Sequence, residues 1–166
     1  MKITSSGIEN GIICDRFGCR GEQFTPGGMP SYSIPFKIHD APEGTKCFAV
    51  IFEDPDAIPV YGFSWIHWIA ANIKGASVPE NSSIDDRNMI QGVNSYHSCA
   101  SDLSIEEATG YGGPYPPDGP HVYDLKVFAL DTELDLMRGF GLNEMKKKMR
   151  GHVLAHAMIS AVYSPR

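Results

Sequence analysis

Two apolar runs, joined by an acidic segment with two prolines, dominate the hydrophobic pattern of the chain. They cover residues 47–52 and 63–73, are rich in β-branched and aromatic residues, and are bounded by Pro and Gly. Short runs of this kind are typical of strands, because breakers on both sides leave too little length for a stable helix. Neither run alternates cleanly between apolar and polar residues. The pattern therefore predicts central strands that are covered on both faces.

A further strand is predicted at residues 121–130, where most apolar and polar positions alternate. Because strand side chains point to opposite faces with a period of two, His121 and Tyr123 share one face at the entry of this strand. By the same parity, Trp65 and His67 share a face of the 63–73 strand.

The other segments give weaker signals. We expect an irregular strand and loop over residues 1–30, an edge strand or a strand broken at Pro35 over 31–38, polar surface loops with little regular structure over 74–102, one helical turn at 105–108, and a loop rich in Pro and Gly at 111–120.

The clearest helix signal lies near the C-terminus. Residues 144–154 place Met, Val and Leu near helical spacing, and Asn143 is the expected N-cap. The tail, 155–163, could continue the helix or return as a strand, and its Val, Ile and Tyr content favours the strand. If the helix continues, His152 and His156 share a helical face, and we interpret them as structural histidines because no third metal ligand lies nearby in the sequence.

Length and composition indicate a soluble protein with one domain spanning residues 1–166. Hydrophobic residues make up 42% and charged residues 20% of the chain, and the formal net charge is −6. The only basic run is 146–148, so nucleic acid is not an expected partner, since binding phosphates needs clustered Lys and Arg. The chain shows neither the apolar core of a signal peptide nor a membrane span, which predicts a cytoplasmic location. Its four cysteines form no CxxC pair and are expected to be reduced there.

Several polar and aromatic residues cluster around the predicted strand ends. Taken one at a time, each has a structural interpretation, since Asp caps turns beside Pro and buried histidines bond to backbone carbonyls. Taken together, two acids at one strand end and two histidines with aromatic neighbours are expected to converge on one pocket. The candidates are Asp54, Asp56, Trp65, His67, Gly113, Pro114, His121 and Tyr123.

The order of these motifs resembles the phosphatidylethanolamine-binding protein family, within it the prokaryotic branch described as Raf-kinase-inhibitor-like. The resemblance covers nearly the whole chain. It rests on DRFGCRGE at 15–22, DPDAIP at 54–59, WIHW at 65–68 followed by ANI, GYGGPYPP at 110–117 followed by DGPHVY, and GHVLA at 151–155. Any one of these pieces is weak, but five in order with compatible spacing are specific.

The resemblance implies a mainly β fold, with a large central antiparallel sheet, a smaller second sheet and a few flanking helices. It also implies a small surface pocket, walled by the eight candidate residues, for phosphate-like groups such as phosphorylethanolamine. In such a pocket His67, His121 and main-chain N–H groups around Gly113 would donate to a phosphate. Asp54 or Asp56 would accept from a histidine's second nitrogen and favour its charged form.

Four features depart from the family pattern. Residues 94–109 form a longer link than expected, which would cover the pocket mouth or contact a partner. Tyr115 stands where prokaryotic relatives commonly have Cys, and Val122 stands where an Arg is common. Ile58 is inserted before Pro59 in the first signature. The pocket residues are retained, and the departures bear on the choice of ligand.

Three functions are compatible with these observations. The leading hypothesis is a non-catalytic binding protein for a small anionic or phosphorylated ligand, without a cofactor or metal, whose cellular role is to modulate a kinase or protease partner. The second is a hydrolase, metal-assisted or not, built from the His and Asp residues, although no nucleophile motif is evident. The third is a protein-interaction inhibitor whose pocket is vestigial. The sequence leaves the oligomeric state open, a homodimer included.

Overall fold

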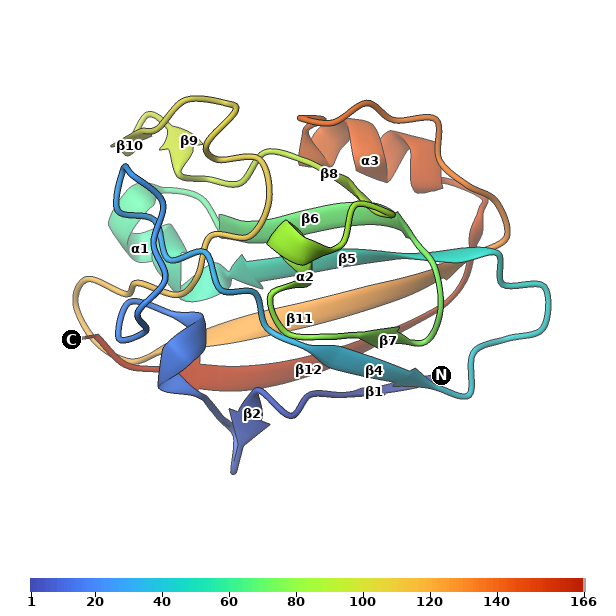
Figure 1. The fold of residues 1–166 in the computed structure, drawn as a ribbon, viewed down its shortest axis with the longest axis horizontal. Helices are drawn as coiled ribbons and strands as arrows, with labels where there is room; N and C mark the ends of the chain where they lie inside the picture. The colour runs from blue at the N-terminus through green and yellow to red at the C-terminus, as the bar shows by residue number, and fades with distance from the viewer. Residues whose placement is uncertain (166) are drawn as a thin grey trace.

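The computed structural model describes residues 1–165 and confirms a mainly β fold with a large sheet, a smaller sheet and a few helices (Figure 1). Its strands are β1 (Lys2–Thr4), β2 (Ile8–Glu9), β3 (Ile12–Ile13), β4 (Phe36–His39), β5 (Cys47–Asp54), β6 (Trp65–Ile73), β7 (Ser77–Val78), β8 (Ile90–Gln91), β9 (His97–Ser98), β10 (Ser101–Asp102), β11 (His121–Leu130) and β12 (Val153–Tyr163). Its helices are α1 (Ile58–Tyr61), α2 (Ser82–Asp85) and α3 (Leu142–Met149), with 3-10 turns at Asp15–Phe17 (η1) and Pro55–Ala57 (η2). No helix within residues 1–165 is long and apolar enough to cross a membrane.

The large sheet has the strand order β2-β3-β12-β11-β5-β6-β8. Its pairs are antiparallel except for β3 and β12, which run parallel where Ile12 meets Val162. Strand β5 lies between β11 and β6, and every one of its residues except Glu53 is buried. The prediction of central strands covered on both faces is therefore confirmed for β5 and β6.

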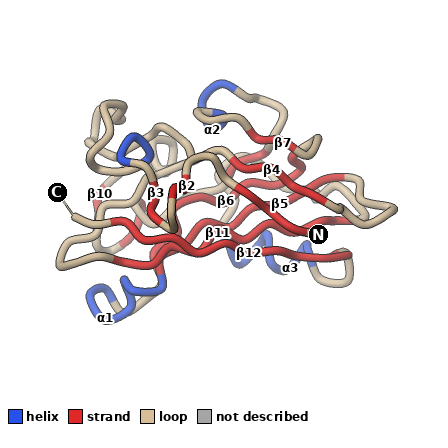
Figure 2. Tube along the Cα trace, turned by 90° about the horizontal axis from the view of Figure 1, so that it is seen from below, coloured by secondary structure: helices blue, strands red, loops and turns tan. Residues whose placement is uncertain are grey.

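The two faces of the large sheet are covered by different elements. Figure 2 shows the smaller sheet, β1-β4-β7, on one side and α1 and α3 on the other. Phe36 of the smaller sheet and Val50 of β5 belong to one hydrophobic cluster, whereas Met145 and Met149 of α3 pack with Ala49 in a second. Burial of successive β5 side chains in opposite clusters explains why its sequence does not alternate.

Two sequence predictions concern loops and edges. Of the two alternatives for residues 31–38, the edge strand is wrong, because β4 lies in the middle of the smaller sheet, and the break at Pro35 is confirmed, because the strand begins only at Phe36. Residues 74–102 are more ordered than predicted, because they contain β7, α2, β8 and the β9–β10 hairpin. Their polar side chains are partly internal: the buried Asn94 amide, for example, donates to the Gly110 carbonyl at 3.0 Å. Residues 105–108 form a single hydrogen-bonded turn, as expected.

The C-terminal helix is shorter than predicted, and the strand after it is confirmed. Helix α3 begins after Gly141 and ends at Met149, because Gly151 adopts a left-handed φ of 78° that turns the chain into β12. Asn143 is thus inside the helix. His152 and His156 do not share a helical face: His152 bonds to Asp131 at 2.8 Å in the turn, and His156 lies on β12.

Candidate functional site

The predicted site residues gather at one end of three neighbouring strands of the large sheet. Asp54 is the last residue of β5, Trp65 is the first of β6, and His121 is the first of β11. Because β5 runs antiparallel to both neighbours, its end lies beside their beginnings, close to α1 (Figure 1). Asp54 also caps η2 by accepting from the Ala57 N–H at 3.2 Å.

A β-bulge in β6 sets the direction of the His67 side chain. The register with β5 shifts between Phe52 and Glu53, so His67 is an extra residue of β6 at this point. Bulges often re-aim a side chain beside a functional site. The rings of Trp65 and His67 both pack against Tyr96, with ring centroids 5.4 and 6.3 Å away, so the two residues share a face as their parity predicted.

His67 is buried and neutral at pH 7. Its Nδ1 lies 2.5 Å from the carbonyl oxygen of Gly112, which can only accept, so Nδ1 carries the proton. Burial lowers the pKa of His67 to about 4, although the charge of Asp54 opposes this change. At neutral pH the Nε2 of His67 is therefore an unprotonated acceptor, and the expectation of a phosphate donor does not hold for this nitrogen.

His121 is held between two carboxylates. Its Nδ1 lies 2.7 Å from Asp54 Oδ2, and its Nε2 lies 2.9 Å from Asp118 Oδ1. Burial disfavours the charged ring, but the hydrogen bonds to Asp54 and Asp118 outweigh burial and raise the pKa of His121. Two carboxylates need two N–H donors, so this ring is an imidazolium and its charge offsets that of the buried Asp54. Asp54 thus has the predicted role of accepting from a histidine.

The loop around Gly113 uses its main-chain N–H groups internally. The Gly112 N–H donates to the His67 carbonyl and the Gly113 N–H to the Pro30 carbonyl, each at 2.8 Å. Pro114 is buried in the same loop. The structure places Gly113 and Pro114 behind the site residues, with the expected phosphate donors already bonded.

Asp56 is not brought together with Asp54. Its side chain is exposed and accepts from the Val122 N–H at 2.8 Å, which anchors η2 to the start of β11. The two acids of the Asp-Pro-Asp sequence therefore differ in role: Asp54 is the buried partner of His121, and Asp56 is an exposed acceptor for the Val122 N–H.

A cavity of about 180 Å³ opens at this end of the sheet. One donor of its lining is unsatisfied: the Trp65 Nε1–H is buried and has no hydrogen-bond partner within residues 1–165. The Tyr123 hydroxyl is buried close to Asp54, and burial together with the charge of Asp54 raises its pKa. The ring of Tyr123 packs 5.2 Å from His67 and 6.4 Å from His121, measured between centroids. The lining consists of Asp54, Ala57, Tyr61, Trp65, His67, Tyr96, Ala100, Ser101, Tyr115 and Pro117.

Sequence reasoning missed much of this lining. Residues 94–109 supply Tyr96, Ala100 and Ser101, so this segment forms part of the cavity lining. Tyr115 was visible only as a departure from the family pattern. Tyr61 carried no signal, because its place follows from the turn of α1 onto the entry of β6.

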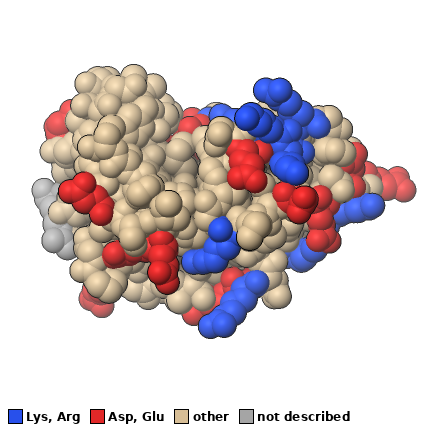
Figure 3. All heavy atoms as spheres, turned by 90° about the horizontal axis from the view of Figure 1, so that it is seen from above, with Lys and Arg blue, Asp and Glu red and all other residues tan. Residues whose placement is uncertain are grey.

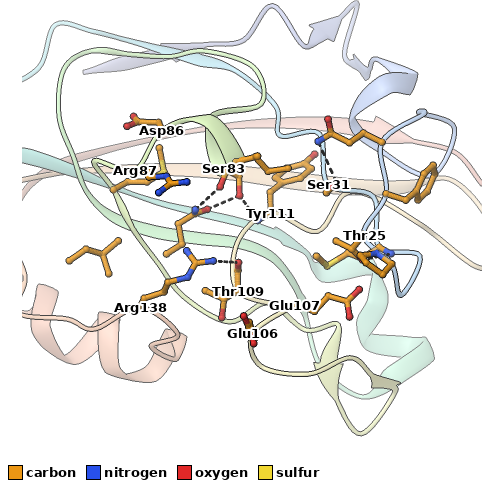
Figure 4. Close-up of a pocket in the computed structure, with 18 residues that line it drawn as sticks. Thr25, Ser31, Ser83, Asp86, Arg87, Glu106, Glu107, Thr109, Tyr111 and Arg138 are labelled. Carbon is orange, nitrogen blue, oxygen red and sulfur yellow. Dashed lines mark hydrogen bonds between the residues drawn. The ribbon is translucent and has the colours of Figure 1, made fainter.

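A larger cavity of about 850 Å³ lies elsewhere, between α2, the loop at 23–31 and the turn at 105–109 (Figure 4). It contains none of the predicted site residues. Many of its polar groups bond to each other or to the backbone: Ser83 donates to Gln91 at 2.7 Å, and Arg138 donates to the Thr109 carbonyl at 3.2 Å. We therefore place the candidate site at the smaller cavity, where a buried donor lacks a partner among the described residues.

Within residues 1–165, basic side chains do not gather at the candidate cavity. Figure 3 looks onto the face that carries α3 and the β9–β10 hairpin. Among the described residues, Lys and Arg lie over the middle and the α3 end of this face, and none lies over the hairpin end. No Lys or Arg is found among the residues that line the smaller cavity. Its charges are those of Asp54 and, directly behind it, His121.

Comparison with known proteins agrees with this architecture. The family model described as phosphatidylethanolamine-binding protein matches residues 4–164. The chain therefore belongs to the phosphatidylethanolamine-binding protein family.

Proteins similar to this chain are found in bacteria and archaea. The chain is 46% identical over 142 residues to the uncharacterized protein YxkA of Bacillus subtilis, covering 83% of this chain and 84% of that protein. It is 32% identical over 171 residues to the UPF0098 protein PH1269 of Pyrococcus horikoshii, covering 98% and 76%. A solved homologue of the family from Chlamydia trachomatis, CT736, superposes with a TM-score of 0.80 at 28% identity, covering 99% of this chain and 97% of that one. YbcL of Escherichia coli superposes with a TM-score of 0.78 at 27% identity, covering 99% and 98%.

Proposed function

We propose that this protein is a non-catalytic binding protein that holds a phosphate-like anion or a phosphorylated head group in the cavity beside Trp65 and His67. The observation that carries this proposal is the indole N–H of Trp65, which is buried beside the cavity without a partner among the described residues. An unsatisfied buried donor costs on the order of 1–3 kcal/mol, which a bound anion would recover. A volume of about 180 Å³ is below the usual range for drug-sized ligands and suits a small ion or head group.

The charge state of the site selects the form of the phosphate. At neutral pH His67 offers an acceptor at Nε2, and Asp54 lines the cavity. A phosphate monoanion, which keeps one P–O–H group, can donate to Nε2, whereas a dianion first requires His67 to take up a proton. Since a phosphate monoester loses its second proton near pH 6, both routes favour binding below about that pH.

Membership of the phosphatidylethanolamine-binding protein family supports a phosphorylated head group as ligand. Catalysis has less support. Both nitrogens of His121 face carboxylates, so no hydroxyl or thiol is placed to be activated by this ring. Action in the cytoplasm, on a kinase or protease partner, remains part of the proposal. Residues 94–109 line the cavity, so a partner protein that contacts this segment would bind differently to the ligand-bound and the ligand-free protein.

Calorimetric titration with phosphate and with phosphorylethanolamine at pH 6 and pH 8 tests the proposal. We expect saturable binding that is weaker at pH 8. In Trp65→Phe, which keeps an aromatic ring but removes the N–H, affinity should fall about tenfold or more, because a hydrogen bond to a charged group is lost. His156→Gln, an exposed change on β12 away from the cavity, is the matched control. If neither compound binds to the wild-type protein at either pH, the proposal is wrong.

A further inference from the structure

Four large aromatic side chains line the candidate cavity. They are Tyr61, Trp65, Tyr96 and Tyr115. The rings of Tyr61 and Trp65 lie 5.0 Å apart and are inclined by 51°, whereas those of Trp65 and Tyr96 lie 5.4 Å apart and are inclined by 87°. The inclined rings pack edge to face or tilted against one another, so the lining offers aromatic surface in more than one orientation. Tyr61 and Tyr115 stand at the rim, with exposed fractions of 37% and 50%.

The polar groups of the wall already make hydrogen bonds within the protein, which leaves fewer acceptor sites for a primary ammonium group. Such a group needs hydrogen-bond acceptors around its three N–H bonds. Asp54 is the only carboxylate in the lining, and both of its oxygens already accept, one from the Ala57 N–H and one from His121. The hydroxyl of Tyr96 is also committed, because it donates to the Gly113 carbonyl at 2.9 Å.

A quaternary ammonium group has the opposite requirements. It carries no N–H, and it is attracted to the faces of Trp and Tyr rings, which is the basis of aromatic cages for methylated ammonium ions. Its positive charge also suits a wall that contains Asp54 and neither Lys nor Arg. The same cavity offers the unpartnered Trp65 Nε1–H and the acceptor of His67 to a phosphate group.

We propose that the cavity selects a phosphate ester that carries a quaternary ammonium group, of the phosphorylcholine type. The phosphate lies at Trp65 and His67, and the trimethylammonium group lies against Tyr61, Tyr96 and Tyr115. This assignment rests on the proposed function, because it names the ligand class of that same site. A monoester should bind better than a diester, since only the monoester keeps a P–O–H group that can donate to His67.

The test is a calorimetric series at pH 6 with four compounds: inorganic phosphate, phosphorylethanolamine, phosphorylcholine and 3,3-dimethylbutyl phosphate. The last has the shape of phosphorylcholine with carbon in place of the charged nitrogen. We expect phosphorylcholine to bind roughly three to thirty times more tightly than either the primary amine or the neutral compound, the range that cation–π contacts give. Glycerophosphorylcholine is a phosphate diester, as the head group of a phospholipid is. Weaker binding of this compound than of phosphorylcholine would indicate a free monoester as ligand, and equal or tighter binding would indicate a lipid.

Two rim variants show whether the aromatic faces are responsible. Because Tyr115 is half exposed, replacing it does not disturb the core. In Tyr115→Leu the ratio of phosphorylcholine affinity to 3,3-dimethylbutyl phosphate affinity should fall towards one, and in Tyr115→Phe it should be kept. Tyr61→Leu and Tyr61→Phe repeat the comparison on the opposite rim.

The possible outcomes separate this inference from the proposed function. If phosphorylethanolamine or the neutral compound binds as tightly as phosphorylcholine, the inference is overturned and the anion site stands. If the ratio survives in Tyr115→Leu and in Tyr61→Leu, the aromatic rim is not the source of selectivity, and the inference is again overturned. If none of the four compounds binds, both the inference and the proposed function fail.

Discussion

Two regions of one site, the bulge of β6 and the entry of β11, each hold one histidine, and the two histidines differ in charge. At the bulge, His67 faces a backbone carbonyl and is neutral. At the entry, His121 faces two carboxylates and is positively charged. Both side chains expose little surface, but burial outweighs the partners of His67, whereas the partners of His121 outweigh its burial. The partners contribute to this difference because a carbonyl dipole compensates a buried charge far less than a carboxylate can.

The largest effect on this difference between the two histidines is expected from Asp54→Asn, which removes the buried carboxylate partner of His121. The pair of Asp54 and His121 is buried, with side chains about 5% and 6% exposed. Removal of one partner from a buried charge pair leaves the other uncompensated, so we expect a loss of about 3 kcal/mol in the free energy of unfolding. Urea denaturation at pH 6 measures this loss. Asp56→Asn, which affects only an exposed acceptor, should cost about 1 kcal/mol or less, and an equal loss in both variants would contradict the contrast.

The two histidines should also give stability opposite dependences on pH. The pKa of His67 lies below its unfolded value of 6.5, so its contribution is present above pH 6.5 and is lost as the pH falls towards about 4, by about 3 kcal/mol. The raised pKa of His121 has the reverse effect. Its contribution is complete below pH 6.5 and is lost as the pH rises through its folded pKa.

Urea unfolding of the wild type between pH 4 and pH 8 measures both slopes. In His67→Gln the slope below pH 6.5 should flatten, while His156→Gln should keep it. A wild-type stability that rises steadily from pH 6.5 down to pH 4 would show that His67 is not the neutral group described here.

The smallest effect is expected at the outer partner of His121. Asp118 is 62% exposed, so Asp118→Asn should change the free energy of unfolding by less than about 1 kcal/mol. It should nevertheless lower the pKa of His121, because one of its two carboxylate partners is removed. NMR titration of the imidazole measures this pKa. Asp102→Asn, which removes an exposed charge from β10, is the control, and an equal decrease in both variants would point to general electrostatics.

Much of the fold was predictable because its strongest signals are local. The runs that became β5 and β6, the alternation of β11 and the strand at the C-terminus follow from residue type, period and flanking breakers. The errors occurred where a single conformation decides between elements. Gly151 adopts a left-handed φ of 78° and ends the helix early. The polar residues around Gln91 and Asn94 were predicted to form surface loops. They are buried instead, because their side chains bond to segments that are distant in the sequence, which local pattern does not show.

The sequence by itself determined which chemistry the site contains: Asp54, Trp65, His67 and His121 at the ends of three strands that must lie together in an antiparallel sheet. Only the tertiary structure decided how each group is used. It bonded the loop N–H groups internally, separated Asp56 from Asp54, and brought Tyr61, Tyr96 and Tyr115 from three distant segments to one cavity. The physical reason is that protonation and hydrogen bonding depend on partners remote in the sequence, whereas strand formation depends on neighbours.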